Sequence, residues 1–239
     1  MLNIYSSSKK IYTFILGLFF PVKCLNCSQY GEIICLECAK EIAKIKTLTC
    51  PECGRISEGG QYCKGCRNKR KDLALKGIIV AARYDAGPVK EIIHHLKYSG
   101  FVSLSDHLGE LICQQIVAQF QNLDFIVVPV PLHISRKNRR GFNQSELIAR
   151  YVSRKLNLPG GDALMRNYKT KNQVGLPRGQ RLTNLLGAFS CSDAKLVKGQ
   201  KILLIDDVST TGATLNECAK ALKEVEAREV WGVVVARNI

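Results

Sequence analysis

Two adjacent carboxylates, Asp206 and Asp207, stand after an apolar run and before a hydroxyl-rich turn. The run at 201–205 predicts a short buried strand, and a helix is expected to start near Ala213. A strand-to-helix turn presents backbone N–H groups at the positive end of a helix, which favours a bound phosphate. Neighbouring carboxylates can accept hydrogen bonds from ribose hydroxyls, so the pattern predicts a ribose phosphate site. The residues expected to bind its 5′-phosphate are Ser209, Thr210, Thr211, Gly212, Ala213 and Thr214.

Two other interpretations compete with a ribose phosphate site at this turn. The acids could simply cap the following helix, or the strand could hold Mg²⁺ as the Walker B strand of a nucleotide hydrolase. Such a hydrolase needs a Gly-x-x-x-x-Gly-Lys-Ser/Thr loop, and the sequence contains none. The strand, the acids, the turn and the helix start all agree with the ribose phosphate interpretation.

The segment closely resembles the 5-phosphoribosyl-1-pyrophosphate (PRPP) motif of type I phosphoribosyltransferases, with two acids before Thr-Thr-Gly-Ala-Thr. The resemblance implies that PRPP or another ribose phosphate binds here together with Mg²⁺. It also implies that Asp206 and Asp207 are the catalytic residues, which would steady the ribose and its developing positive charge. A nitrogen nucleophile would attack C1 as pyrophosphate leaves.

The 239 residues carry a formal net charge of +15, which indicates an anionic partner. Residues 125–145 and 163–192 contain cations and no acids, so both stretches could flank a pyrophosphate. Prolines would rigidify the first stretch, and arginines can contact phosphate oxygens through two hydrogen bonds. A solvated basic face is the simpler alternative. The residues expected to bind pyrophosphate are Pro131, Arg136, Arg139, Arg140, Arg178 and Arg181.

Eight of the eleven cysteines form four Cys-x-x-Cys pairs. Each pair can direct two thiolates at one metal ion, and two pairs complete a tetrahedral site without an open position. A disulfide framework and an iron–sulfur cluster are the alternatives. Consecutive pairing predicts about two structural zinc ions, one held by Cys24, Cys27, Cys35 and Cys38 and the other by Cys50, Cys53, Cys63 and Cys66.

Residues 1–22 place two lysines before an apolar run in a way that imitates a signal peptide. No small-x-small cleavage site follows, and the run from Ile11 to Val22 is too short to span a bilayer. Its apolar residues recur at helical spacing, so we expect an amphipathic helix and no transmembrane segment. The protein is therefore expected to be cytoplasmic, with peripheral contact at the inner membrane as the alternative.

A charge run at 67–71 resembles an exposed linker, and strand and helix patterns alternate after it. We expect strands at 77–84, 125–130, 201–205 and 229–236, and helices at 89–97, 105–120 (capped by Ser105), 144–156 and 213–225. The alternation predicts an α/β domain at 76–239 with a mostly parallel sheet and helices on both faces. A small zinc-ribbon domain at 23–71 would precede it. Ligands of such sheets bind at the carboxyl ends of the strands.

The strand at 125–130 leads into Val-Pro-Val-Pro-Leu and then Arg-Arg-Gly-Phe-Asn-Gln at 139–144. This order resembles the signature of the competence protein F (ComF, or GntX-like) family, and the cysteine pairs and the Tyr84–Gly100 segment, with Lys97 and Tyr98, extend the resemblance. It implies a type I phosphoribosyltransferase fold, with a pyrophosphate loop after the strand and a mobile loop at 169–181 that closes over PRPP. A floppy surface loop and simple helix capping by Asn143 and Gln144 are the alternatives.

Three functions remain open at the level of the sequence. The protein could be a PRPP-dependent transferase whose acceptor the sequence does not identify, or a PRPP sensor that changes partner binding. Because the family is associated with DNA uptake in natural transformation, it could also be a non-catalytic module that binds single-stranded DNA and competence or other DNA-processing proteins. The charge run expected to contact DNA is Arg67, Lys69, Arg70 and Lys71, with a solvated spacer as the alternative.

Overall fold

Continuously apolar runs form the strands of a four-stranded parallel sheet in the computed structural model, which describes residues 22–168, 185 and 187–237. The strand order is β1-β6-β5-β2. Nearly every residue of these strands is buried, as expected for a parallel sheet that is covered on both faces. The strands are β1 (Gly77–Arg83), β2 (Ile126–Pro129), β5 (Lys201–Ser209) and β6 (Glu229–Arg237).

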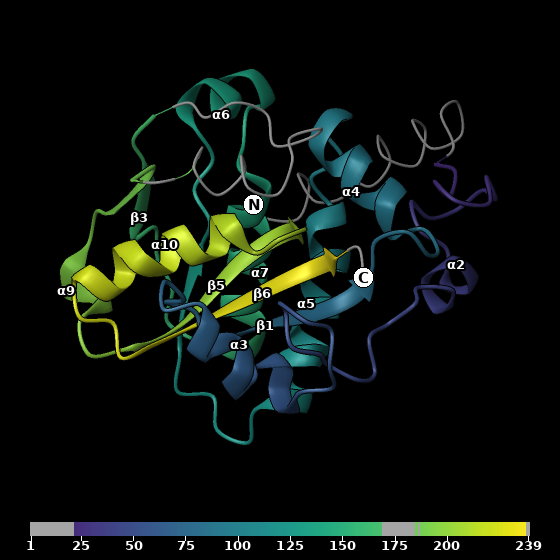
Figure 1. Ribbon diagram of the computed structural model, residues 1–239. Coiled ribbons are helices and arrows are strands. Elements are labelled where there is room, and N and C mark those ends of the chain that lie inside the picture. Colours follow the sequence, from purple (N-terminus) through teal and green to yellow (C-terminus); the bar gives the residue numbers. More distant parts are fainter. Residues whose placement is uncertain (1–21, 169–184, 186, 238–239) are drawn as a thin grey trace.

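Parallel pairing brings the carboxyl ends of all four strands to one edge of the sheet (Figure 1). Pro129 lies opposite Ile205, so β2 ends just before the acid pair on β5. Ser209 and Arg83 both lie opposite Arg237, which is the last residue of β6. The acids and the hydroxyl-rich turn are therefore neighbours of the ends of β2 and β6.

Helices cover both faces of the sheet, as the alternating sequence pattern predicts (Figure 1). Helices α5 (Leu104–Gln119) and α7 (Gln144–Leu156) pack together on one face, and α10 (Ala213–Glu224) covers the other. Helix α4 (Val89–Tyr98) follows β1, and α6 (Ile134–Arg140) follows β2. Both therefore stand on the side of the sheet where the strands end.

Three local features differ from the sequence-based expectations. Helix α5 begins at Leu104, and the hydroxyl of Ser105 donates to Val102 O at 2.7 Å instead of capping the helix. The segment expected to be a turn after β2 contains α6, whose start is capped by His133 and whose end is Gly141 at φ 85°. Strand β5 continues beyond Ile205 through both acids to Ser209, because residues 206, 208 and 209 pair with β6.

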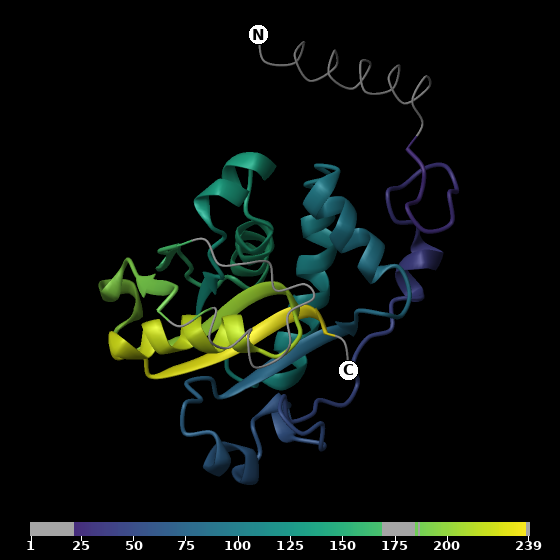
Figure 2. The same cartoon turned by 45° about the horizontal axis from the view of Figure 1, so that its top comes forward.

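The cysteine-rich head lies along β1. The first ribbon contains α2 (Leu36–Lys40), and the second contains the short 3-10 helix η1 (Glu58–Gly60) and α3 (Lys64–Lys69). Figure 2 shows the two ribbons apart from each other, joined by a segment that runs beside β1. A bridge at Lys44–Ala82 pairs this segment with β1, and a bridge at Gln61–Gly77 pairs the second ribbon with it, so β1 is not left as an open edge of the sheet.

The basic run at 67–71 is not an exposed linker, because much of it folds into α3 and makes structural contacts. The Arg67 guanidinium donates to Leu75 O at 2.9 Å and to Lys76 O at 3.0 Å. Arg70 forms ion pairs with Glu52 at 3.0 Å and Asp72 at 2.8 Å. Lys69 and Lys71 remain exposed.

A two-stranded antiparallel sheet, β3 (Leu164–Arg166) and β4 (Phe189–Cys191), precedes α9 (Ala194–Val197). The loop expected at 169–181 lies wholly outside the described residues, and so does the amphipathic helix expected in residues 1–22 except for Val22. Among the described helices, none combines the length and apolar character that a membrane crossing requires.

Candidate functional site

The Asp206–Asp207 pair lies at the carboxyl end of β5, next to the first turn of α7. Asn143 caps α7 by accepting from Ser145 N at 3.2 Å, and its amide also donates to Val130 O at 3.0 Å. The cap holds Ser145 against β5, where its hydroxyl donates to Asp206 Oδ1 at 2.8 Å. The same oxygen accepts from Asp207 N at 2.9 Å. The two acceptor bonds orient the Asp206 carboxylate.

Lys97, from the last turn of α4, provides the positive partner of this acid pair. Its Nζ lies 2.8 Å from Asp207 Oδ2, and the Asp207 side chain is only 5% exposed. Burial opposes the charge on Lys97, but the attraction of Asp207 outweighs it and raises the pKa of Lys97. Lys97 and Asp207 therefore form a mostly buried ion pair across more than one hundred residues of chain.

Asp206 resists ionisation in this setting. Burial, followed by the charge of Asp207, raises the pKa of Asp206 from its ordinary value of 3.8 to about 7, although the hydrogen bond from Ser145 opposes the rise. A second carboxylate beside the first disfavours full ionisation of the pair. Perturbed carboxyls of this kind are concentrated at functional sites.

Arg140 places a second cation beside the acids. Its guanidinium lies 5.5 Å from the centre of the Tyr98 ring and donates to Gln144 Oε1. Burial lowers the pKa of Arg140, while the nearby charge of Asp207 acts in the opposite direction. The segment after β2 and the last turn of α4 thus meet around the acid pair.

The structure brings some of the predicted pyrophosphate-binding residues near the acids and leaves others undescribed. Arg136 is half-buried and Arg139 is exposed, and both lie on α6 with Arg140. Pro131 is half-buried at the entrance to this segment. The remaining two candidates, Arg178 and Arg181, lie outside the described residues.

Arg166 on β3 belongs to the acid-free stretch at 163–192, but the sequence patterns did not place it among the residues expected to bind pyrophosphate. Burial, followed by repulsion from Arg136, lowers the pKa of Arg166, while Asp206 acts in the opposite direction. Its guanidinium also lies 5.3 Å from the centre of the Phe189 ring. Arg166 therefore belongs to the same cluster of charges, at the described end of the strand that leads toward 169–184.

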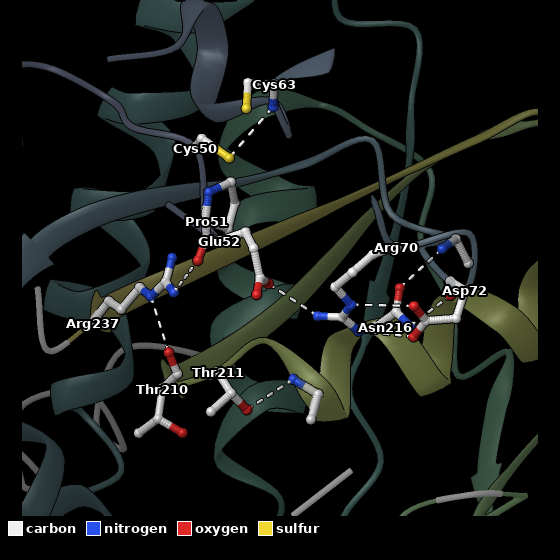
Figure 3. A network of polar contacts seen from close by, with 12 residues as sticks. Cys50, Pro51, Glu52, Cys63, Arg70, Asp72, Thr210, Thr211, Asn216 and Arg237 are labelled. Carbon is white, nitrogen blue, oxygen red and sulfur yellow. Dashed lines mark hydrogen bonds and ion pairs between the residues drawn. The ribbon is translucent and has the colours of Figure 1, made fainter. Parts of the chain in front are cut away.

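The hydroxyl-rich turn links β5 to α10 as the sequence predicts. Gly212 is the residue before the helix and has φ 76°, a left-handed conformation that favours glycine. A Cβ on Gly212 would stand 2.9 Å from Ile78 Cδ1 and 3.4 Å from the Tyr62 hydroxyl. Thr211 Oγ1 accepts from Ala213 N at 3.3 Å, and Thr210 O accepts from Arg237 Nε at 3.1 Å (Figure 3). The turn is thus compact, and protein packs behind it.

The two cysteine tetrads predicted from the spacing are both formed. Within each tetrad the four sulfur atoms lie within 4.8 Å of one another. The Cys27–Cys35 and Cys53–Cys63 sulfur atoms are 3.6 and 3.8 Å apart. Sulfur ligands about 2.3 Å from one tetrahedral ion stand about 3.8 Å from each other, so each tetrad fits a single zinc ion.

Backbone groups prepare one cysteine of each tetrad for metal binding. Burial opposes ionisation of Cys24, but N–H groups of Cys27 and Cys35 outweigh it and lower the pKa to about 6. In the second tetrad burial is again opposed by backbone N–H groups, led by that of Cys63, and the pKa of Cys50 falls to about 7. Ionised thiols are the form that binds zinc, so these two positions favour it.

Comparison with known proteins identifies two domain families and a set of relatives. A phosphoribosyl transferase domain matches residues 108–239, and a double zinc ribbon domain matches residues 15–67. Competence protein F of Haemophilus influenzae is 31% identical over 230 residues, which cover 91% of this chain and 99% of the relative. The DNA utilization protein YhgH of Escherichia coli K12 is 32% identical over 205 residues, covering 83% and 88%. Competence protein ComFC of Bacillus subtilis is 29% identical over 199 residues, covering 81% and 79%.

Proposed function

The chain belongs to the competence protein F family and carries a phosphoribosyl transferase domain behind a double zinc ribbon, and from this premise we propose that it binds PRPP or another ribose phosphate. The observation that carries the proposal is the turn at 210–213, which enters α10 directly after the Asp206–Asp207 pair. Backbone N–H groups at a helix start suit a phosphate, and carboxylate oxygens suit the ribose hydroxyls.

The charges around the acid pair support a ligand that carries pyrophosphate. Lys97 and Arg140 stand beside Asp207, while Arg136 and Arg166 interact with the same cluster. Asp206 and Asp207 offer the hard oxygen ligands that Mg²⁺ prefers, so they would hold the ion, which when bound would neutralise charge on pyrophosphate. Lys97 already balances Asp207, and it would keep that carboxylate oriented toward the ribose.

The names of the relatives support a role in DNA uptake or DNA use. Competence protein F, competence protein ComFC and the DNA utilization protein YhgH each align with four fifths or more of this chain. We therefore propose that the protein with this ribose phosphate site has a role in the processing of DNA that enters the cell. It would either act on that DNA or be regulated while the DNA is processed.

A titration of PRPP into the purified zinc-loaded protein, with and without Mg²⁺, tests the proposed ligand. Saturable binding that Mg²⁺ strengthens is the expected result. Release of pyrophosphate during incubation with PRPP would add a transferase or hydrolase activity, and Asp206→Asn combined with Asp207→Asn should remove it. If neither PRPP nor ribose 5-phosphate binds at millimolar concentration, the assignment is wrong.

A basic cavity supports a second function, the binding of single-stranded DNA. The cavity has a volume of about 750 Å³ and lies between α3, the segment that follows it, and the later turns of α10. It is at the opposite end of the strands from the acid pair, because Glu229 and Val230 at the start of β6 line it. Its cations are Arg67, Lys71, Lys76, Lys220, Lys223 and Arg228.

Three of these cations are the best candidates for contact with phosphates. Arg67 and Lys223 are tied to backbone carbonyls, and Lys220 is paired with Glu217 at 2.6 Å. Lys71 and Arg228 are exposed and Lys76 is half-buried. This set replaces the four-residue run expected from the sequence, because Arg67 and Arg70 hold the second ribbon in place.

The salt dependence of DNA affinity tests this assignment. Each neutralised phosphate contributes a slope of about −0.7 to a plot of log affinity against log salt for single strands. Replacing Lys71, Lys76 and Arg228 with Gln should therefore flatten the slope by about two, without changing PRPP affinity. Equal slopes in the variant and the wild type would show that the cavity does not bind DNA. The matched control replaces three exposed cations elsewhere, namely Lys46, Lys90 and Lys195.

A further inference from the structure

In the second ribbon, the Cys50–Cys53 turn is linked to the hydroxyl-rich turn at 210–213 through its two middle residues, Pro51 and Glu52. Pro51 O accepts from the Arg237 guanidinium at 2.6 Å, and Arg237 Nε donates to Thr210 O at 3.1 Å (Figure 3). One guanidinium therefore bridges the metal-binding turn and the hydroxyl-rich turn. Arg237 can do so because it ends β6 in register with Ser209.

Glu52, the other middle residue, begins a second path. It pairs with Arg70 at 3.0 Å, and Arg70 also pairs with Asp72 at 2.8 Å. Asn216 on the first turn of α10 donates to Asp72 O at 3.1 Å and accepts from Ala74 N at 2.9 Å (Figure 3). Asn216 is only 2% exposed. This path connects the same metal-binding turn to the helix start that would face a phosphate.

Tyr62, the residue before Cys63, supplies a third contact. It is 5% exposed, and its hydroxyl stands 3.4 Å from the position that a Cβ on Gly212 would take. The second ribbon thus packs directly behind the left-handed residue of the turn. The described contacts of the first ribbon go elsewhere: Asn26 donates to Glu41 within the ribbon, and Glu41 O approaches Gly87 before α4.

The Arg237 bridge controls the direction of a backbone N–H group. The Thr210 carbonyl and the Thr211 N–H share one planar peptide unit and, in a trans peptide, point in opposite directions. Holding Thr210 O toward Arg237 therefore directs Thr211 N–H away from it, toward the outer side of the turn. A ligand phosphate would meet an N–H group that is already oriented, which reduces the ordering cost of binding.

We propose that the second zinc ribbon helps to form the phosphate site, with Arg237 as the positioning residue that couples its cysteine tetrad to Thr210. The tetrad consists of Cys50, Cys53, Cys63 and Cys66. The ligand in this inference rests on the proposed function. Metal in this tetrad fixes the Cys50–Cys53 turn, and the turn fixes Thr210 through Arg237. Occupation of the two sites is then reciprocal, so that zinc strengthens phosphate binding and bound phosphate strengthens zinc binding by the same factor.

The test uses the full-length zinc-loaded protein and ribose 5-phosphate as the probe. Arg237→Gln should keep its zinc, weaken ribose 5-phosphate about tenfold by calorimetry, and speed hydrogen exchange at the amides of 211–213. The matched control is Arg83→Gln, because Arg83 lies at the same register on the neighbouring strand and pairs with exposed Asp85 instead. The control should keep both the affinity and the exchange rate of the wild type within about twofold.

Reciprocity supplies the decisive second measurement. Saturating ribose 5-phosphate should raise the affinity for one of the two zinc ions about tenfold in equilibrium competition with a chromogenic chelator in the wild type, and should lose that effect in Arg237→Gln. An equal gain in affinity for both zinc ions, or the same gain in the variant, would overturn the coupling. If the wild type binds neither ribose 5-phosphate nor PRPP, the proposed function fails, and exchange at 211–213 with and without chelator still decides whether the ribbon orders the turn. Unchanged exchange after zinc removal would refute the inference.

Discussion

Asp206→Asn is expected to stabilise the folded protein, although it alters the proposed binding site. Burial and the neighbouring charge of Asp207 raise the pKa of Asp206 from 3.8 to about 7 in the folded state. In the unfolded chain the carboxyl has its ordinary value, so the unfolded state releases this proton at lower pH. Asn resembles the neutral acid in size, and its side-chain oxygen can still accept from Ser145. The substitution therefore removes a cost of ionisation and keeps the local hydrogen bond.

The size and pH window of the effect follow from the pKa change. A pKa raised from 3.8 to about 7 makes folding less favourable as pH rises between those values, by about 4 kcal/mol in total, with no further change above about pH 7. The two carboxyls titrate as a pair and share the cost of ionisation, so we expect about half of that sum from Asp206 alone. For a chain of this length, ~2 kcal/mol corresponds to a melting temperature about 4–8 °C higher at pH 8.

Calorimetric melting of the zinc-loaded proteins at about pH 5.5 and pH 8 measures the effect. About half of the gain at pH 8 should disappear at pH 5.5. Glu110→Gln is the control of opposite sign, because the Tyr151 hydroxyl, 2.9 Å away, holds the pKa of Glu110 below its ordinary value. That variant should have a lower melting temperature at pH 8. A carboxyl whose pKa is lowered in the folded protein stabilises the folded state at pH values above its ordinary pKa. A melting temperature of Asp206→Asn that is lower than wild type at both pH values would refute the reasoning.

Three further outcomes are expected. Elemental analysis of protein purified without added metal should find about two zinc ions per chain, and iron with a visible chromophore would contradict this. Thr211→Ala combined with Gly212→Val should abolish PRPP binding, because φ is 76° at Gly212 and a Cβ there would crowd Ile78; unchanged calorimetric affinity would reject the phosphate assignment. Lys97→Met should lower the melting temperature at pH 8 by leaving Asp207 without its partner, and adding Asp207→Asn should restore it. A double variant no more stable than the single one would show that the ion pair is not the cause.

The sheet, its main helices and both tetrads could be predicted because local patterns determine them. Apolar runs of four or more residues predicted the strands, and the cysteine spacing predicted which sulfur atoms come together. The family expected from the residues at 139–144 and 206–214 is also confirmed by the relatives. The structure describes the placement of the proposed PRPP-binding residues other than Arg178 and Arg181, while the roles of all of them stay predictions.

Contacts between distant segments were beyond the reach of the sequence patterns. A lysine in the last turn of a helix is usually solvated, and nothing local indicates that Lys97 pairs with a residue 110 positions later. Helix α6 has four basic residues in seven and no apolar periodicity, so it depends on His133 and Gly141 at its ends. The sequence places Arg70 in an exposed run that would contact DNA, because nothing local indicates that its partner Glu52 lies in another turn of the chain.

The pairing of residues 44 and 61 with β1 limits how the protein can be divided. On the other side of the sheet Val127 pairs with Gly160, so both outer strands are covered by the chain itself. A fragment that begins at residue 76 would retain the phosphoribosyl transferase domain but uncover the outer rim of β1 and its backbone hydrogen-bonding groups. Unpaired edge strands form hydrogen bonds with strands of other molecules, so such a fragment should aggregate or dimerise through β1. The zinc-ribbon head therefore acts as a protective cover for one edge of the sheet, and the phosphoribosyl transferase domain depends on it to stay monomeric.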